Sequence, residues 1–266
     1  MAAETRTGTV LDRILDARRA SVSHRKRVLP ETVLRMAAKD APPARDFAAA
    51  LSRPGINVIA ELKKASPSRG VLRENFVPAD LASALEVAGA AALSVVTEEE
   101  FFQGSLRNLQ DARKKISIPV LRKDFIFDAW QVWEARAAGA DSFLLIVAAL
   151  EDESLRELLA LGRRNGMEPL VEVHTREELQ RANAADAQII GVNNRDLKTL
   201  EVNIETSMDL IDDIPDGCIA VCESGIRSTA EIGRLREAGF DAFLVGEQLM
   251  TQPDPAAALR ELLGAP

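Results

Sequence analysis

Residues 168–193, EPLVEVHTREELQRANAADAQIIGVN, contain the pattern that decides the fold. Two short apolar runs, EPLVEV (168–173) and AQIIGVN (187–193), flank an amphipathic stretch of about three turns (175–184). Runs of this length rich in β-branched residues are typical of buried strands, whereas the stretch between them has the periodicity of a helix. The segment therefore predicts a strand–helix–strand unit with two parallel strands.

The same unit recurs along the chain from residue 55 onward. The other apolar runs are INVIAEL (56–62), AALSVVT (91–97), IPVLRKDF (118–125), DSFLLIV (141–147), CIAVCES (218–224) and AFLVGE (242–247). The other helical segments lie near 79–88, 105–115, 128–138, 152–164, 203–213, 228–238 and 254–263. Eight such units predict an α/β fold, a single (β/α)8 TIM barrel. A doubly wound open sheet is the alternative, but it rarely repeats so evenly, and no GxGxxG follows the first strand.

Residues 1–53 lie outside this repeat and predict an N-terminal helical extension packed on a barrel of residues 54–266. Within the extension, VLDRILDARRASVSHRKRV (10–28) and DFAAAL (46–51) have helical patterns. The sequence leaves open whether this segment caps the bottom of the barrel or folds over its top.

The composition limits the classes of function. A net charge of −8 without a strongly basic stretch argues against nucleic-acid binding. The first ten residues lack the apolar core of a signal peptide, and no apolar run is long enough to span a bilayer. Cys218 and Cys222 lie too far apart along one predicted strand for a disulfide, and only His24 and His174 could join them in a zinc site. We therefore expect a cytoplasmic protein without a metal.

Polar residues gather at the C-terminal ends of the predicted strands, where parallel barrels form their active sites. They are Glu61, Lys63, Lys123, Glu172, Asn193, Arg195, Glu223 and Ser224. Period-two alternation places Glu61 and Lys63 on one face, and likewise Asn193 and Arg195. Ile59 and Val221 have the same parity as these polar residues, which predicts apolar layers inside the barrel and a charged layer at its mouth. Any one of these residues alone is more often a structural ion-pair partner. Burying so many charges is costly unless function requires it, so together they predict a functional site at the barrel mouth.

The seventh and eighth units carry a phosphate-binding pattern. ESGI (223–226) leaves one strand and VGE (245–247) leaves the next, at the loops where barrels of this class bind phosphate. Gly225 and Gly246 allow backbone N–H groups to approach an anion closely. The alternative is that both glycines only make tight turns.

Six segments resemble the indole-3-glycerol-phosphate synthase family. They are IAELKKASPSRG (59–70), SVVTEEEFFQGS (94–105), PVLRKDFIFD (119–128), MEPLVEVH (167–174), IIGVNNRDL (189–197) and CESGI (222–226). The motifs fall in family order, and ExKxxSPS and LxKDF are specific to that family. The resemblance implies a carboxy-lyase of tryptophan biosynthesis that needs no cofactor. Its phosphorylated substrate is 1-(2-carboxyphenylamino)-1-deoxyribulose 5-phosphate, whose indole ring it closes with loss of carbon dioxide and water.

The resemblance also implies the roles of individual residues. Lys123 protonates the ribulose carbonyl as general acid, and Glu172 assists dehydration as base. Lys63 contacts the anionic groups of the substrate and competes with Lys123 for the role of acid. The residues that orient the substrate and the lysines are Glu61, Asn193, Glu223 and Arg195. Ser66 belongs to the first loop, and the aryl pocket is lined by Pro67, Phe102 and Phe125. The phosphate site consists of Ser224, Gly225, Gly246 and the backbone at Glu247.

Two details and two rival functions stay open. Glu247-Gln248 stands where the family often has a serine, which matters only if a hydroxyl binds the phosphate. His174 has the parity to point into the site, although the family reaction uses no histidine. One rival is another sugar-phosphate barrel such as phosphoribosylanthranilate isomerase, which calls for a Cys or Asp pair. The other is a silent phosphate-binding subunit of a larger assembly. The sequence does not reveal the oligomeric state; we expect a monomer or weak homo-oligomer.

Overall fold

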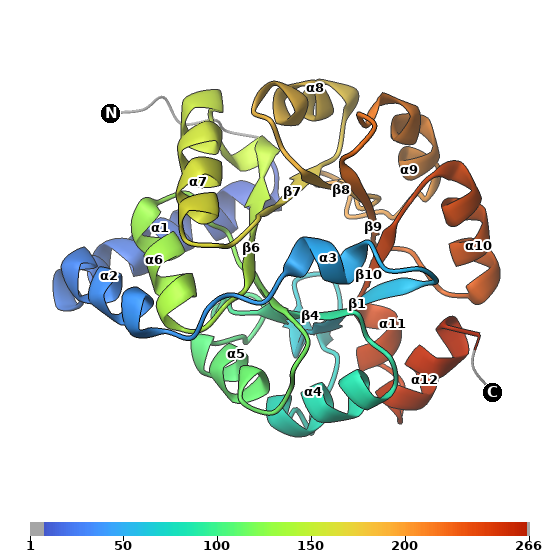
Figure 1. The fold of residues 1–266 in the computed structure, drawn as a ribbon, viewed down its shortest axis with the longest axis horizontal. Coiled ribbons are helices and arrows are strands. Elements are labelled where there is room, and N and C mark those ends of the chain that lie inside the picture. Colours follow the sequence, from blue (N-terminus) through green and yellow to red (C-terminus); the bar gives the residue numbers. More distant parts are fainter. Residues whose placement is uncertain (1–7, 265–266) are drawn as a thin grey trace.

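The computed structural model describes residues 8–264 and forms a closed eight-stranded barrel, which confirms the predicted fold (Figure 1). The barrel strands are β1 (Asn57–Leu62), β4 (Ala92–Val96), β5 (Val120–Lys123), β6 (Ser142–Ile146), β7 (Leu170–Val173), β8 (Ile189–Asn193), β9 (Ile219–Glu223) and β10 (Ala242–Val245). Each pairs in parallel with the next, and β10 pairs with β1. The first loop also holds a small antiparallel pair that the sequence did not predict, β2 (Ala65–Ser66) and β3 (Gly70–Val71).

A helix follows each barrel strand and overlaps its predicted range. These helices are α4 (Pro78–Val87), α5 (Leu106–Arg113), α6 (Ala129–Ala137), α7 (Asp152–Arg164), α8 (Arg176–Ala184), α9 (Glu205–Leu210), α10 (Thr229–Ala238) and α12 (Pro255–Leu262). Three short pieces add to them: α11 (Glu247–Met250) and the 3-10 turns η1 (Val147–Ala149) and η2 (Ile211–Asp213). No helix within residues 8–264 combines the length and apolar character needed to cross a membrane.

The strands are apolar on both faces because each face packs against a separate layer. Val58 and Cys222 belong to the large core between the sheet and the outer helices, whereas Ile59 and Val221 fill the barrel interior. This alternation confirms the predicted parity. Residues of the interior parity at the C-terminal strand ends therefore project into the barrel mouth.

The N-terminal segment starts at the top of the barrel. Helix α1 (Val10–Val28) lies over the C-terminal strand ends, where Leu11 and Leu15 pack onto the interior core. Helix α2 (Glu31–Asp40), which the sequence did not predict, then packs against α6 on the outside (Figure 1). The chain thus runs down the outer wall toward the other end of the barrel.

The same segment also closes the bottom of the barrel. In helix α3 (Phe47–Leu51), Phe47 and Leu51 are buried in the interior core, and the amide of Asn57 at the start of β1 donates to the carbonyl of Leu51 over 2.8 Å. The sequence left bottom and top as alternatives, and the segment covers both ends. Residues 1–7 of the expected extension, and residues 265–266, lie outside the described residues.

Candidate active site

A cavity of about 520 Å³ opens at the C-terminal ends of the strands, below α1. It is lined by every residue that the sequence analysis proposed for the site: Glu61, Lys63, Ser66, Pro67, Phe102, Lys123, Phe125, Glu172, Asn193, Arg195, Glu223, Ser224, Gly225, Gly246 and Glu247. These residues come from β1, β5, β7, β8, β9 and the loops around them. Because barrel closure brings distant strand ends together, one cavity collects them all.

Lys123, the last residue of β5, lies between two carboxylates at the centre of this cavity. Its Nζ atom is 3.0 Å from Oε2 of Glu172 on β7 and 2.6 Å from Oε2 of Glu223 on β9. Burial opposes the charge of Lys123, but the two carboxylates outweigh it and raise the pKa of the lysine above its ordinary value. Lys123 is therefore held as an ammonium group with a proton to donate.

The two carboxylates beside Lys123 titrate differently. Burial disfavours the ionised form of Glu172, but Lys123 and His174 outweigh it and lower the pKa of Glu172. Burial and the negative charge of Glu172 raise the pKa of Glu223 to about 7. Two close carboxylates that share one cation cannot be equally acidic. Glu172 is therefore ionised at neutral pH, while Glu223 exchanges its proton there.

A second lysine stands beside this group. Nζ of Lys63 is 2.7 Å from Oε1 of Glu61. The other oxygen of that carboxylate, Oε2, and the Oε1 atom of Glu223 are buried and have no hydrogen-bond partner among residues 8–264. A buried acceptor without a partner is costly. Two carboxylates that line the cavity, Glu61 and Glu223, therefore each keep one unsatisfied acceptor atom.

Two glycines make room for these carboxylates. A Cβ atom on Gly191 would lie 2.2 Å from Oε1 of Glu223, and one on Gly246 would lie 2.4 Å from Oε1 of Glu61. Gly246 thus leaves space for the Glu61 carboxylate, in addition to the phosphate-binding role that the sequence predicts for its backbone. Gly191 was not among the site residues predicted from the sequence, although a glycine inside a strand signals the close approach of another group.

One end of the cavity combines glycine turns with arginines. Ser224 and Gly225 both have a left-handed backbone, with φ values of 67° and 87°, and so turn the chain sharply after β9. The Ser224 hydroxyl donates to Oδ1 of Asn193 over 2.9 Å. Nearby, Arg69 and Arg195 contact the Glu247 carboxylate at 2.9 Å and 3.4 Å. Two guanidinium groups beside exposed backbone turns suit an anionic ligand.

The other end of the cavity is apolar. The rings of Phe102 and Phe125 lie 6.0 Å apart between centroids, tilted by 39°. From above, α1 contributes Val10, Leu11 and Ile14 to the same lining. An aromatic or aliphatic group of a ligand fits this end. The contribution of α1 could not be predicted, since the sequence did not place this helix at the top.

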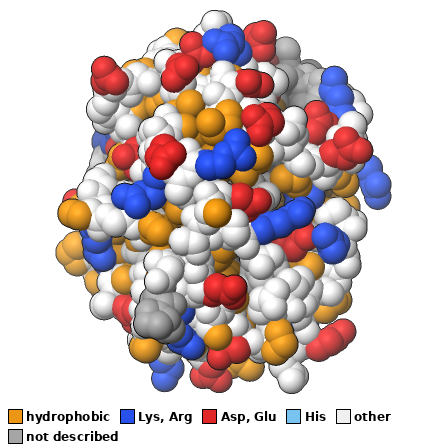
Figure 2. Space-filling model, turned by 90° about the vertical axis from the view of Figure 1, so that its right-hand side faces the viewer, with side chains coloured by type: hydrophobic (Ala, Val, Ile, Leu, Met, Phe, Trp, Pro, Cys, Tyr) orange, Lys and Arg blue, Asp and Glu red, His pale blue; other side chains and the backbone are white. Residues whose placement is uncertain are grey.

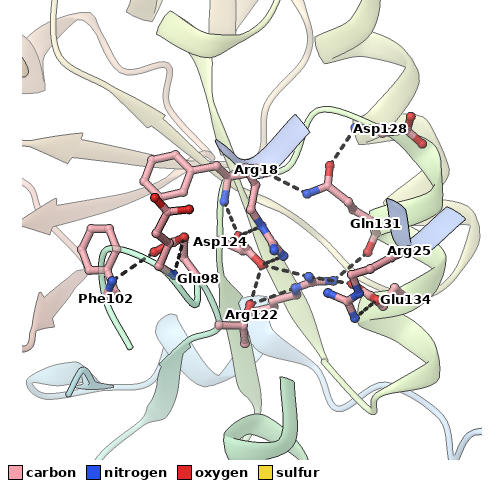
Figure 3. Close-up of polar contacts among 12 residues, drawn as sticks. Arg18, Arg25, Glu98, Phe102, Arg122, Asp124, Asp128, Gln131 and Glu134 are labelled. Atoms are coloured by element: carbon pink, nitrogen blue, oxygen red, sulfur yellow. Dashed lines mark hydrogen bonds and ion pairs between the residues drawn. The ribbon is translucent and has the colours of Figure 1, made fainter. Parts of the chain in front are cut away.

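A buried charge network ties α1 to the strand that carries Lys123 (Figure 3). Asp124 accepts hydrogen bonds from Arg18 of α1 over 2.8 Å and 2.6 Å, from Arg122 over 2.9 Å and from Thr97 over 2.6 Å. Burial opposes ionisation of Asp124, but the arginines outweigh it and lower its pKa. Asp124 thereby links α1, β5 and the loop after β4.

Hydrogen bonds in the same region also hold the backbone of both aromatic residues. The backbone N–H of Phe125 donates to Asp124 over 2.9 Å, and that of Phe102 donates to Glu98 over 3.0 Å. On the outer side, Arg122 also contacts Glu134 of α6 at 2.8 Å. The network therefore positions the apolar end of the cavity together with Lys123.

His174 lies next to the cavity and does not line it. Its Nε2 atom is 3.4 Å from Oε1 of Glu172, and its Nδ1 atom is 3.1 Å from Oε2 of Glu178. Cys222 is buried among Asn194 and Ser207, where burial raises its pKa to about 11. Neither side chain lies at the cavity wall.

Comparison with known proteins adds independent information. A family model described as indole-3-glycerol phosphate synthase matches residues 11–262. The chain is 52% identical to the protein of that name from Rhodococcus opacus (strain B4), over 97% of this chain and 96% of the relative. It is 48% identical to that of Burkholderia vietnamiensis (strain G4 / LMG 22486), over 95% and 98%.

Solved structures with much lower identity share the fold. A 3-hexulose-6-phosphate synthase superimposes with a TM-score of 0.62 at 14% identity, over 79% of this chain and 99% of that one. A thiamine phosphate pyrophosphorylase from Pyrococcus furiosus gives 0.58 at 16%, over 78% and 93%. At these identities the likeness shows the barrel alone.

The charge network predicts that Arg18→Ala destabilises the protein. We expect the free energy of unfolding in urea to fall by about 3 kcal/mol, the lower end for breaking a buried ion pair, because Arg122 and Thr97 still hold Asp124. As a matched control, Arg107→Ala removes an exposed pair with Asp111 and should cost about 0.5 kcal/mol or less. Equal losses in the two variants would contradict the structural role of Arg18.

Proposed function

The chain belongs to the indole-3-glycerol phosphate synthase family, and we propose that it closes the indole ring of 1-(2-carboxyphenylamino)-1-deoxyribulose 5-phosphate in tryptophan biosynthesis. It is thus a carboxy-lyase that releases carbon dioxide and water. The observation that carries the proposal is Lys123, which is held as an ammonium group between Glu172 and Glu223 in the middle of a cavity with one apolar and one anion-binding end.

The two ends of the cavity fit the two ends of this substrate. The anthranilate ring suits the apolar end at Phe102 and Phe125, and the phosphate suits the turns at Gly225 and Gly246. The ribulose carbonyl then lies in between, near Lys123. The protein carries a net charge of −8, yet local cations decide the binding of an anion, because charge effects are screened over about 10 Å at physiological salt.

In ring closure the aryl carbon attacks the carbonyl carbon, and the carbonyl oxygen becomes a hydroxyl with the proton of Lys123. The carboxylates that raise the pKa of Lys123 also make it a weak acid in the free enzyme. A substrate hydroxyl that donates to Glu223 draws its charge away from Lys123. Binding therefore makes the proton of the lysine easier to transfer.

Decarboxylation and dehydration complete the reaction. Loss of the carboxylate as carbon dioxide restores the aromatic benzene ring, and in this proposal Lys63 contacts that carboxylate before it leaves. Glu172, ionised in the free enzyme, then takes a proton from the CH2 carbon of the new five-membered ring, while Lys63, which still carries its proton after Lys123 has given up its own, protonates the departing hydroxyl so that it leaves as water. Glu61 and Asn193 hold the lysines and the hydroxyl groups in place, and Arg195 supports them from the phosphate end.

The first loop and the phosphate site complete the proposed assignment. Ser66 at the end of β2 and Pro67 in the turn that follows line the cavity, and we propose that they contact the aryl ring. Phosphate binding through the backbone near Ser224 and Glu247 needs no hydroxyl at Gln248. The rival isomerase would need a Cys or Asp pair at the strand ends, and Cys222 does not line the cavity.

Further properties remain predictions from the sequence. We expect a cytoplasmic enzyme that works without a cofactor or metal, as a monomer or weak homo-oligomer. Binding of nucleic acid is not expected, because Lys and Arg are mixed with Asp and Glu on the face shown in Figure 2 rather than forming one basic patch there.

The proposal predicts that the purified protein converts the carboxyphenylamino substrate to a product with indole fluorescence. Lys123→Ala should lower kcat by about 10²–10⁴-fold, the usual contribution of a general acid, while Lys114→Ala on the exposed end of α5 leaves kcat unchanged. Circular dichroism checks that both variants fold. Absence of product from the unchanged protein at high concentration would rule out this function.

The second prediction concerns pH. The pKa of Glu223 is raised to about 7, so the group is ionised above that pH and neutral below it, where it no longer balances Lys123. We expect kcat/KM to fall about tenfold per pH unit below 7, as for one essential carboxylate. Glu223→Gln should flatten this limb, whereas exposed Glu237→Gln should keep it. The phosphate of the substrate titrates equally in assays of the unchanged protein and of both variants. If kcat/KM of Glu223→Gln falls below pH 7 as steeply as that of the unchanged protein, Glu223 is not the group that titrates.

A further inference from the structure

His174 lies directly behind Glu172, on the side away from the cavity. It follows Glu172 by two residues at the end of β7, and its side chain is 8% exposed. The two oxygens of the Glu172 carboxylate face different cations: Oε2 faces Nζ of Lys123 at 3.0 Å, and Oε1 faces Nε2 of His174 at 3.4 Å. The reaction proposed above assigns no role to this ring.

Glu178 of α8 fixes the other side of the ring. Its Oε2 atom accepts the backbone N–H of His174 over 2.7 Å and lies 3.1 Å from the ring Nδ1. A carboxylate at neutral pH only accepts hydrogen bonds, so Nδ1 carries a proton. In a neutral ring, Nε2 would then turn its lone pair toward the Glu172 carboxylate, which is repulsive. The arrangement therefore favours the doubly protonated imidazolium.

The charges around the ring act in the same direction. It faces carboxylates from three elements, Glu172 on β7, Glu178 on α8 and Glu223 on β9, while Lys123 lies beyond Glu172 on β5. Burial opposes the charged ring, but these carboxylates outweigh it and raise the pKa of His174. The positive charge at His174 is thus balanced inside the protein.

We propose that His174 is a positioning residue whose imidazolium, held by Glu178, orients Glu172 and keeps it ionised while Lys123 gives up its proton. This inference rests on the proposed function. In ring closure Lys123 becomes a neutral amine, and Glu172 loses the cation on Oε2 while it is still buried. A buried carboxylate without a cation takes up a proton. The second cation on Oε1 prevents this, so Glu172 enters dehydration as a base.

A purely structural histidine would not need this arrangement. The bond from its backbone N–H to Glu178 anchors the strand end whatever the side chain is, and Thr175 already caps α8 by accepting from the N–H of Glu178. Only the contacts of the two ring nitrogens with Glu172 and Glu178 depend on the protonation state of the ring. The proposal is therefore separable from a role in folding.

The protonation state of His174 can be measured without substrate. The chain has only two histidines, and His24 is exposed on α1, so the histidine side-chain NMR signals of the 15N-labelled full-length protein are assigned with His24→Gln alone. We expect the His174 ring to lose its second proton at a higher pH than the His24 ring. A midpoint for His174 at or below that of His24 would overturn the proposal, whether or not the protein makes indole.

Kinetics test the consequence for catalysis. We expect His174→Gln to lower kcat about tenfold, because the cation that lies 3.4 Å from Oε1 of Glu172 is lost, with KM changed less than about threefold. The alkaline limb of the kcat–pH profile that follows the His174 midpoint should disappear, and His24→Gln should keep it. A kcat–pH profile of His174→Gln identical to that of the unchanged protein would overturn the inference and leave the proposed function intact.

A second variant, Glu178→Gln, tests the proposal without changing His174 itself. Glu178→Gln keeps an oxygen for the backbone N–H of His174 and removes only the charge behind the ring. We expect both the NMR midpoint of His174 and the alkaline limb of kcat to move to lower pH together. If neither the NMR midpoint nor the alkaline limb moves, the proposal is overturned, even if His174→Gln fails to fold.

Discussion

The contacts of Lys123 with Glu172 and Glu223 join β5, β7 and β9 across the mouth of the barrel. A cation placed this deep is stable only with carboxylates beside it, and carboxylates placed this deep need the cation in return. The remaining features of the site follow from that constraint. Gly191 leaves room for Glu223, whose Oε1 atom lies against this glycine, and the unpaired oxygens belong to carboxylates that line the cavity.

The second group of buried charges, around Asp124, connects this centre to the N-terminal helix. Arg18 reaches down from α1, and Arg122 reaches outward to α6, so the residue next to Lys123 is fixed from both sides. A hydrophobic contact could stabilise the position of α1 as much, but it would not fix the position of α1 along the barrel as closely as directional hydrogen bonds do. The directional bonds place Leu11 and Ile14 at the apolar end of the cavity. The extension therefore contributes to the lining of the cavity.

Most of the barrel could be predicted because the hydrophobic periodicity of each strand and helix depends only on the residues of that segment. The parity of Ile59 and Val221 separated interior from exterior, and strand ends identified the charged residues. The position of α1 could not be predicted, because an amphipathic pattern does not say which surface it covers. Helix α2 was missed since it exposes apolar residues such as Met36. The pairing of His174 with Glu178 depends on how α8 follows its strand, which spacing alone does not determine.

A crystal structure of the protein with indole-3-glycerol phosphate tests the central claim most directly, since the product keeps both ends of the substrate. We predict the indole ring between α1 and the pair Phe102 and Phe125, the phosphate at the turns of Gly225 and Gly246, and Nζ of Lys123 within hydrogen-bond distance of the ligand or a water bound to it. A product bound in the opposite direction, or one that leaves Lys123 without contact while Lys63 alone reaches the reacting carbons, would contradict the account.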